Sequence, residues 1–161
     1  MAFTAGQKVR AADLNDALAA AGCEAQFNMA VDQSAAHATV VPVLFGTTVV
    51  SSTLVTKGTS GSGSTFTLNR AGVWTASATI RYQSGGSSAF SSVYCTLNGT
   101  QIVSQAVTTS SILVLHVALT FRANLNDVLT INVYHERGSS VTIKADNTNA
   151  LGRLNLAWLH P

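Results

Sequence analysis

Residues 65–82 (TFTLNRAGVWTASATIRY) constrain the fold most, because their longer second half alternates with a period of two. From Trp74 to Tyr82 every second side chain falls on one face, and the residues between them fall on the other. The small residues Ala76 and Ala78 stand between the two large rings, which suits a sheet face against which a second sheet packs closely. We therefore predict a short strand, a tight turn at residues 71–72 and a long strand within an all-β fold.

The composition indicates a surface with few charges. The chain has 161 residues, enough for one compact domain with an appendage. Only 10% of the residues are charged, where an ordinary soluble domain has about 25%. We expect most of the surface to consist of uncharged residues, namely Ser, Thr, Asn, Gln and Gly. We also expect neighbouring subunits to cover part of it.

Charge and hydropathy argue against several classes of partner. The net charge is +2 and the arginines are scattered singly, so no basic stripe for nucleic acid is expected. No apolar run approaches the ~20 residues of a membrane span, and the opening residues do not resemble a signal peptide, so we expect a soluble product of a cytoplasm. Cys23 and Cys95 are isolated in the sequence, and we expect two free thiols with no zinc site.

Residues 1–37 differ from the rest and are predicted to form an attachment arm. Residues 11–21 (AADLNDALAAA) favour a short helix with an apolar stripe, and residues 23–37 are interpreted as an extended linker. The alternative is a helix folded back onto its own domain. The apolar side chains expected to make the attachment are Phe3, Val9, Leu14, Leu18 and Phe27.

Residues 38–161 have the pattern of strands and turns throughout. Strands are predicted near residues 39–43, 47–55, 66–68, 73–82, 89–97, 101–107, 111–121, 128–135, 141–145 and 153–159. The pair Asn98-Gly99 is a strong hairpin signal, and residues 57–64 (KGTSGSGS) and 83–88 are predicted to be flexible loops. About eight to ten short strands with frequent turns favour a two-sheet antiparallel sandwich of the jelly-roll kind.

Residues 111–121 (SILVLHVALTF) are apolar on both sides of the predicted strand. A sandwich strand normally shows one face to water, so a second subunit is expected to cover the second face. The residues assigned to this contact are Ile112, Val114, His116 and Ala118. The alternative is a central strand covered by a loop of its own chain.

Three segments follow one another in a characteristic order: residues 66–82 (FTLNRAGVWTASATIRY), 93–103 (VYCTLNGTQIV) and 123–134 (ANLNDVLTINVY). In this order they resemble the C1q/TNF-like jelly-roll family. The resemblance implies a jelly roll and a homotrimer around a threefold axis. The family's phenylalanine-glycine pattern near the end of the chain is replaced here by residues 151–154 (LGRL), and Asn126 stands where a glycine is usual, so no calcium or receptor site is carried over.

Residues 3–15 (FTAGQKVRAADLN) are similar to the opening segment of many virion proteins of tailed bacteriophages. In those proteins a short N-terminal arm precedes a β-rich knob. The resemblance implies a capsid decoration, head-fibre or tail-associated protein that docks on other virion proteins through this arm.

The sequence offers little catalytic chemistry. It has no P-loop, dinucleotide fingerprint or Gly-x-Ser-x-Gly elbow, and its seven acidic residues are dispersed, although paired carboxylates in space remain an alternative. A lone His116 lacks the three or four ligands that zinc needs, unless three copies form a ring on an axis. We predict no enzyme and no cofactor.

Taken together, we predict a non-enzymatic homotrimeric virion protein with an arm over residues 1–37 and a knob over 38–161. One alternative is a knob that binds a host-cell glycan or protein through the loops that contain Lys57, Ser60, Ser84 and Ser87. The other alternative is a free-standing soluble trimer of the C1q kind, whose arm needs no partner.

Overall fold

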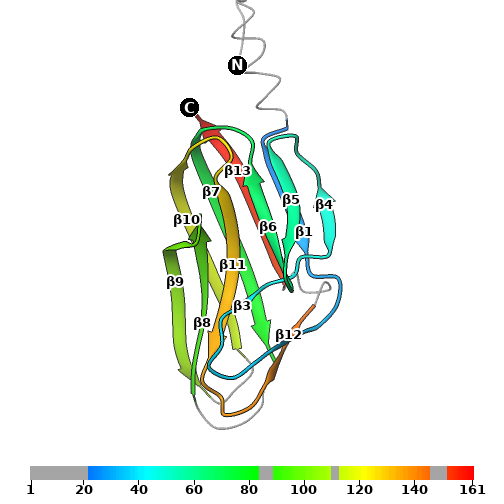
Figure 1. Ribbon diagram of the computed structural model, residues 1–161, viewed down its shortest axis with the longest axis vertical. Coiled ribbons are helices and arrows are strands. Elements are labelled where there is room, and N and C mark those ends of the chain that lie inside the picture. Colours follow the sequence, from blue (N-terminus) through cyan, green and yellow to red (C-terminus); the bar gives the residue numbers. More distant parts are fainter. Residues whose placement is uncertain (1–21, 84–88, 110–112, 146–151) are drawn as a thin grey trace, which may run out of the picture.

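The computed structural model describes residues 22–83, 89–109, 113–145 and 152–161, and every regular element in these ranges is a β-strand. Two antiparallel sheets face each other in a long, narrow sandwich (Figure 1). The all-β jelly-roll prediction is confirmed, while the predicted N-terminal helix lies outside the described residues. Thirteen strands are described, more than the eight to ten expected, because several short segments pair at the edges.

Sheet A contains the long strand β7 and its neighbours. Its path runs β2-β12-β7-β13-β1-β4, and β10 pairs with β7 on the other side. The strands of sheet A are β1 (Glu24–Asn28), β2 (Gln33–Ala35), β4 (Thr47–Val50), β7 (Gly72–Tyr82), β10 (Leu113–Ala123), β12 (Val141–Lys144) and β13 (Arg153–His160).

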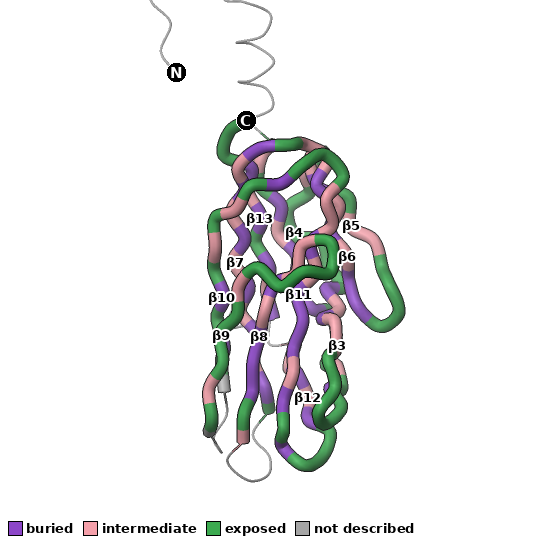
Figure 2. Tube along the Cα trace, turned by 60° about the vertical axis from the view of Figure 1, so that its left-hand side comes forward, coloured by how far each residue is buried: buried purple, intermediate pink, exposed green. Residues whose placement is uncertain are grey.

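Sheet B packs against sheet A and has the path β5-β6-β11-β8-β9, with β3 paired to β11. Its strands are β3 (Val41–Pro42), β5 (Val55–Ser60), β6 (Gly63–Leu68), β8 (Ala89–Leu97), β9 (Thr100–Thr109) and β11 (Val128–His135). The edge strands β9 and β10 lie on the same side of the sandwich (Figures 1 and 2).

The core forms where the alternating faces of the two sheets meet. The predicted inward face of β7, from Trp74 to Tyr82, is fully or almost fully buried, which confirms that prediction. Phe66 of sheet B packs against Phe27 and Phe45, with ring centroids 4.7 and 5.8 Å apart. Figure 2 shows buried and less buried residues following one another along β8 and β11, as expected for strands with one face inward.

The chain passes from sheet B to sheet A at Gly72. β6 ends at Leu68 and β7 begins at Gly72, so the predicted turn connects two sheets rather than two paired strands. Gly72 has φ +136°, a backbone conformation that other residues rarely adopt. Beside it the indole N–H of Trp158 donates to the Ala71 carbonyl at 3.1 Å, and that of Trp74 donates to the Arg70 carbonyl at the same distance.

The predicted linker over residues 23–37 is wrong in its central part. Residues 24–28 form β1, which lies between β13 and β4, and residues 33–35 form β2 beside β12. The reason is non-local pairing: the main chain of β1 completes the hydrogen bonding of β13, a strand more than a hundred residues later. β13 in turn lies between β7 and β1.

Two further boundaries differ from expectation. The strand predicted over residues 47–55 ends at Val50, and a turn over residues 51–54 leads into β5 in the other sheet. Residues 57–64, predicted to be a flexible loop, form the hairpin β5–β6 with a turn at Gly61, whose φ is +59°. By contrast, the hairpin at Asn98 and Gly99 is confirmed, with φ +50° and +80°, respectively.

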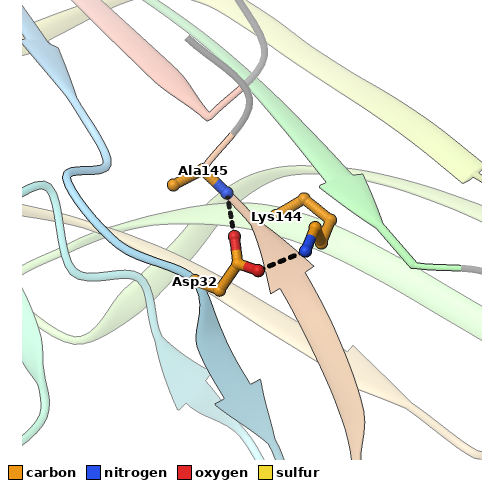
Figure 3. Close-up of polar contacts among 3 residues, drawn as sticks. All are labelled: Asp32, Lys144 and Ala145. Atoms are coloured by element: carbon orange, nitrogen blue, oxygen red, sulfur yellow. Dashed lines mark hydrogen bonds and ion pairs between the residues drawn. The ribbon is translucent and has the colours of Figure 1, made fainter.

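A carboxylate fastens the segment before β2 to the end of β12. Asp32 pairs with the Lys144 ammonium and accepts the main-chain N–H of Ala145 at 2.8 Å (Figure 3). The hydrogen bond from Lys144, followed by that from Ala145, lowers the pKa of the Asp32 carboxyl. Both side chains are partly exposed, so this clip contributes modestly to stability.

Candidate functional site

The predicted subunit contact on β10 is open in the single chain. Val114 is 45% exposed, and His116 and Ala118 are also exposed, while Leu115 and Val117 between them are buried in the core. Ile112 lies outside the described residues. Within the described chain β10 pairs only with β7, so it is an edge strand rather than the central strand of the alternative interpretation.

His116 is held by two hydrogen bonds on this edge. Its Nδ1 lies 3.0 Å from Thr79 Oγ1 on β7, and its main-chain N–H donates to Gln105 Oε1 of β9 at 2.5 Å. The second bond covers a main-chain donor that an edge strand would otherwise offer to a foreign strand. The β10 edge is therefore closed to strand addition at His116, while its outward face remains open.

The outward face of sheet A has small side chains in its middle. Thr75 of β7 pairs with Ala157 of β13, and Ser77 of β7 lies between Asn155 of β13 and Ala118 of β10. Together with Val50, which is 43% exposed, Thr75, Ser77 and Ala157 help to line a hollow of about 270 Å³. Small residues allow the backbone of a neighbour to come close, so this surface is suited to a packed protein contact.

Most residues assigned to particle attachment lie outside the described residues: Phe3, Val9, Leu14 and Leu18. The assignment of Phe27 is wrong. Its side chain is only 2% exposed and packs on Phe66, because β1 turns it toward the core. A ring used in this way cannot also bind another protein.

The loop residues predicted to bind a ligand have a different setting from the one expected. Lys57 and Ser60 belong to β5, where the Lys57 ammonium donates to the Gly46 carbonyl at 2.9 Å and Ser60 pairs with Gly63. This region is a paired hairpin, not a flexible ligand loop. Ser84 and Ser87 lie outside the described residues.

The outward face of sheet B carries a feature that the sequence reasoning missed. Phe90 and Tyr94 of β8 and Tyr134 of β11 lie on it among hydroxyl and amide side chains, over two adjoining hollows of about 460 and 290 Å³. In the sequence this feature corresponds to aromatic and polar residues at the even-numbered positions of β8 and β11. These residues could not be grouped without knowing that the two strands are neighbours.

His135 is the centre of a buried polar cluster. Its Nε2 donates to the Ala35 carbonyl at 3.0 Å, because its Nδ1 accepts the N–H of Arg137 at 3.3 Å. The buried Arg137 donates through Nε to Ser91 Oγ at 3.0 Å, and the Tyr82 hydroxyl donates to the Ser92 carbonyl at 2.7 Å. These bonds join β2, β7, β8 and β11, so the cluster is structural.

The described residues offer no centre for metal chemistry. Nowhere in the described ranges do three His, Cys, Asp or Glu side chains gather as metal ligands. Cys95 is buried, which raises the pKa of its thiol to about 12, and Cys23 is half-buried; both are free, as expected. Likewise, the part of the chain that the structure describes holds no helix long and apolar enough to cross a membrane.

Comparison with known proteins identifies the architecture. No protein-family model matches the sequence, and no curated protein sequence matches it. The structure is similar to that of murine APRIL at pH 5.0, with a TM-score of 0.62 and 9% identity over 85% of this chain and 98% of the other. It is also similar to Eiger TNF from S. frugiperda, with a TM-score of 0.57 and 13% identity over 85% and 92%. The described residues thus have a TNF-like jelly-roll fold.

Proposed function

We propose that this protein is a non-enzymatic structural protein of a bacteriophage virion, a homotrimer that docks through its N-terminal arm and displays the jelly-roll knob. The observation that carries the proposal is the open face of β10, which exposes Val114, His116 and Ala118. The side chains beside it in the middle of sheet A are small, so another subunit can approach closely. The opening segment, similar to that of tailed-phage virion proteins, supports the docking role.

The burial pattern of β10 supports the proposed trimer contact. β10 has buried residues on one side and an exposed valine on the other, so it exposes apolar surface to water until a partner covers it. Covering apolar surface contributes about 25 cal/mol per Å², so three such faces around one axis can offset the cost of association. Three copies also bring three His116 side chains near one axis.

The described chain begins at a defined end of the sandwich. The Cys23 carbonyl accepts the N–H of Trp158 at 3.0 Å, so the described chain begins beside the last strand, and both lie at the same end of the sandwich (Figure 1). The loop after β11 lies at the opposite end. A protein fastened at residues 1–21 would therefore present its other end and its sheet faces outward.

The trimer contact is tested by Val114→Asp. In a closed interface the new carboxylate would be buried without a partner, which costs several kcal/mol per subunit, so we expect monomers in sedimentation velocity at micromolar concentration. Leu125→Asp is the matched control, because Leu125 is 59% exposed in the turn after β10. A Val114→Asp protein that sediments like the wild type would contradict this contact.

The docking role is tested by removing residues 1–21. The shortened protein retains every described strand, so we expect it to keep the oligomeric state of the full chain and to lose binding to particles that lack the protein. Co-sedimentation with such particles measures this loss. Equal binding with and without the segment would contradict the arm assignment and leave the trimer contact untouched.

A further inference from the structure

The outward face of sheet B holds a second candidate site, separate from the proposed trimer contact. Two hollows meet there, and both are lined by Tyr94 and Gln101. The larger one continues over Thr96 and Asn132, and the smaller one reaches Tyr134. We call these two adjoining hollows together the sheet B groove; their lining includes residues of β8, β9 and β11.

The chemistry of the groove is polar but uncharged. Among the described residues, no Asp, Glu, Lys, Arg or His lines either hollow. Their side chains offer hydroxyl groups of Ser, Thr and Tyr and the amides of Gln101 and Asn132. Such groups can both donate and accept hydrogen bonds, which matches the hydroxyls of a sugar.

Three aromatic rings add flat apolar surfaces to these polar groups. Phe90 is 38% exposed and meets Tyr134 edge to face, with centroids 6.1 Å apart. The Tyr134 hydroxyl donates to Glu136 at 2.8 Å, which fixes the direction of that ring from outside the groove. Tyr94 is half-buried in the middle of the groove and lines both hollows, so a ligand that spans them would pass over it.

Strand pairing and a side-chain hydrogen bond hold the floor of the groove together. Asn132 is almost fully buried, and its amide donates to Thr96 Oγ1 at 3.3 Å on the neighbouring strand. Tyr94 and Asn132 are direct cross-strand partners, as are Thr96 and Thr130. Side chains on paired strands lose little freedom on binding, which favours a preformed site.

We propose that the sheet B groove binds a neutral oligosaccharide, with a sugar ring stacked on Tyr94 and its hydroxyls bonded by Gln101 and the threonines around Asn132. Aromatic rings satisfy the apolar faces of sugars, and hydroxyl and amide groups satisfy their edges. Acidic glycans and nucleic acids are poorly matched, because the lining offers no cation.

This inference goes beyond the proposed function and does not depend on it. The groove lies on sheet B, whereas Val114 and Ala118 lie on the outward face of sheet A, on the other side of the sandwich. A trimer contact confined to the outward face of sheet A would leave the groove available, and a monomer would also retain it.

The test uses the full chain on an array of neutral oligosaccharides, with sialylated and sulfated glycans as a second arm. Binding to neutral glycans is expected, and Tyr94→Ala should weaken it about tenfold through loss of the stacked ring. Tyr94→Phe keeps the ring and should stay within about threefold of the wild type. Leu125→Ala, outside the groove, is the matched control.

Gln101→Ala keeps the proposal testable if Tyr94→Ala fails to fold, because Gln101 is exposed on the edge strand β9. It should also weaken neutral-glycan binding. Absence of neutral-glycan binding by the wild type, preference for the acidic arm, or binding unchanged in both Tyr94→Ala and Gln101→Ala would overturn the proposal. Sedimentation of the same variants reports the trimer separately.

Discussion

Replacing Gly72 by alanine should be among the most damaging single-methyl changes in this protein. Gly72 joins the two sheets with φ +136°, and a Cβ added there would overlap the His160 carbonyl oxygen and lie 2.7 Å from Trp158 Nε1. The carbonyl belongs to main chain and cannot rotate away. The backbone strain and the steric overlap therefore act together.

The size of the effect follows from those two contributions. A residue forced into such a backbone conformation costs about 1–3 kcal/mol, and an overpacked methyl group costs a further 1–3 kcal/mol or so. The sum, about 2–6 kcal/mol, is a large part of the roughly 5–15 kcal/mol that stabilises an ordinary domain.

Alanine substitutions at two other glycines measure the backbone strain and the steric overlap separately. Gly99 has φ +80°, and a Cβ added there would have no other atom within 4 Å, so Gly99→Ala should show backbone strain alone, about 1–2 kcal/mol. Gly63 lacks a positive φ, but a Cβ there would overlap Pro42 Cβ, so Gly63→Ala should show overpacking alone, about 1–3 kcal/mol. Gly72→Ala should exceed both.

Urea denaturation at one fixed protein concentration measures the three variants, since the stability of an oligomer depends on concentration. Tryptophan fluorescence is a suitable signal, because Trp74 and Trp158 both donate to main-chain carbonyls beside Gly72. A Gly72→Ala protein no less stable than Gly99→Ala would refute the reasoning.

Two further predictions concern titratable groups. Because the pKa of Asp32 is lowered by folding from an unfolded value of about 3.9, its stabilisation is present above about pH 4 and is lost as the pH falls through the folded pKa. Asp32→Asn should therefore lower the urea midpoint by the equivalent of about 0.5 kcal/mol at pH 7 and by less in acid, and a difference that persists in acid would contradict this. Burial raises the pKa of Cys95 to about 12, so a thiol reagent at pH 8 should label only Cys23 in the folded protein and both cysteines in urea; rapid native labelling of Cys95 would contradict its burial.

The parts of the fold predicted from sequence are those in which one strand carries its own pattern. In β7 and β13 large apolar residues alternate with small or polar ones, so burial could be assigned without knowing the neighbours. The Asn98-Gly99 turn was equally local, since its two positive φ values are a property of those two residues.

The parts that sequence reasoning missed depend on partners far away in the chain. In β1 only Ala25 and Phe27 alternate, and the strand forms because β13 and β4 flank it. The glycine- and serine-rich hairpin β5–β6 is held by main-chain pairing, which composition does not reveal. The sheet B groove likewise required the register that sets Tyr94 opposite Asn132.

The candidate site shows the same division. Because residues 111–121 are apolar on both sides, we predicted that a second subunit covers the face that carries Val114. Val114 is 45% exposed in the single chain, and the contact with a second subunit stays a prediction. Phe27 was misassigned because an aromatic residue in a polar segment has the same sequence pattern whether it meets another protein or its own core.

The mass of the full chain in solution tests the central claim most directly. Sedimentation equilibrium at micromolar concentration should give three times 16.7 kDa, about 50 kDa, if three copies assemble over the open face of β10 as proposed. A single species of 16.7 kDa under the same conditions would contradict the trimer.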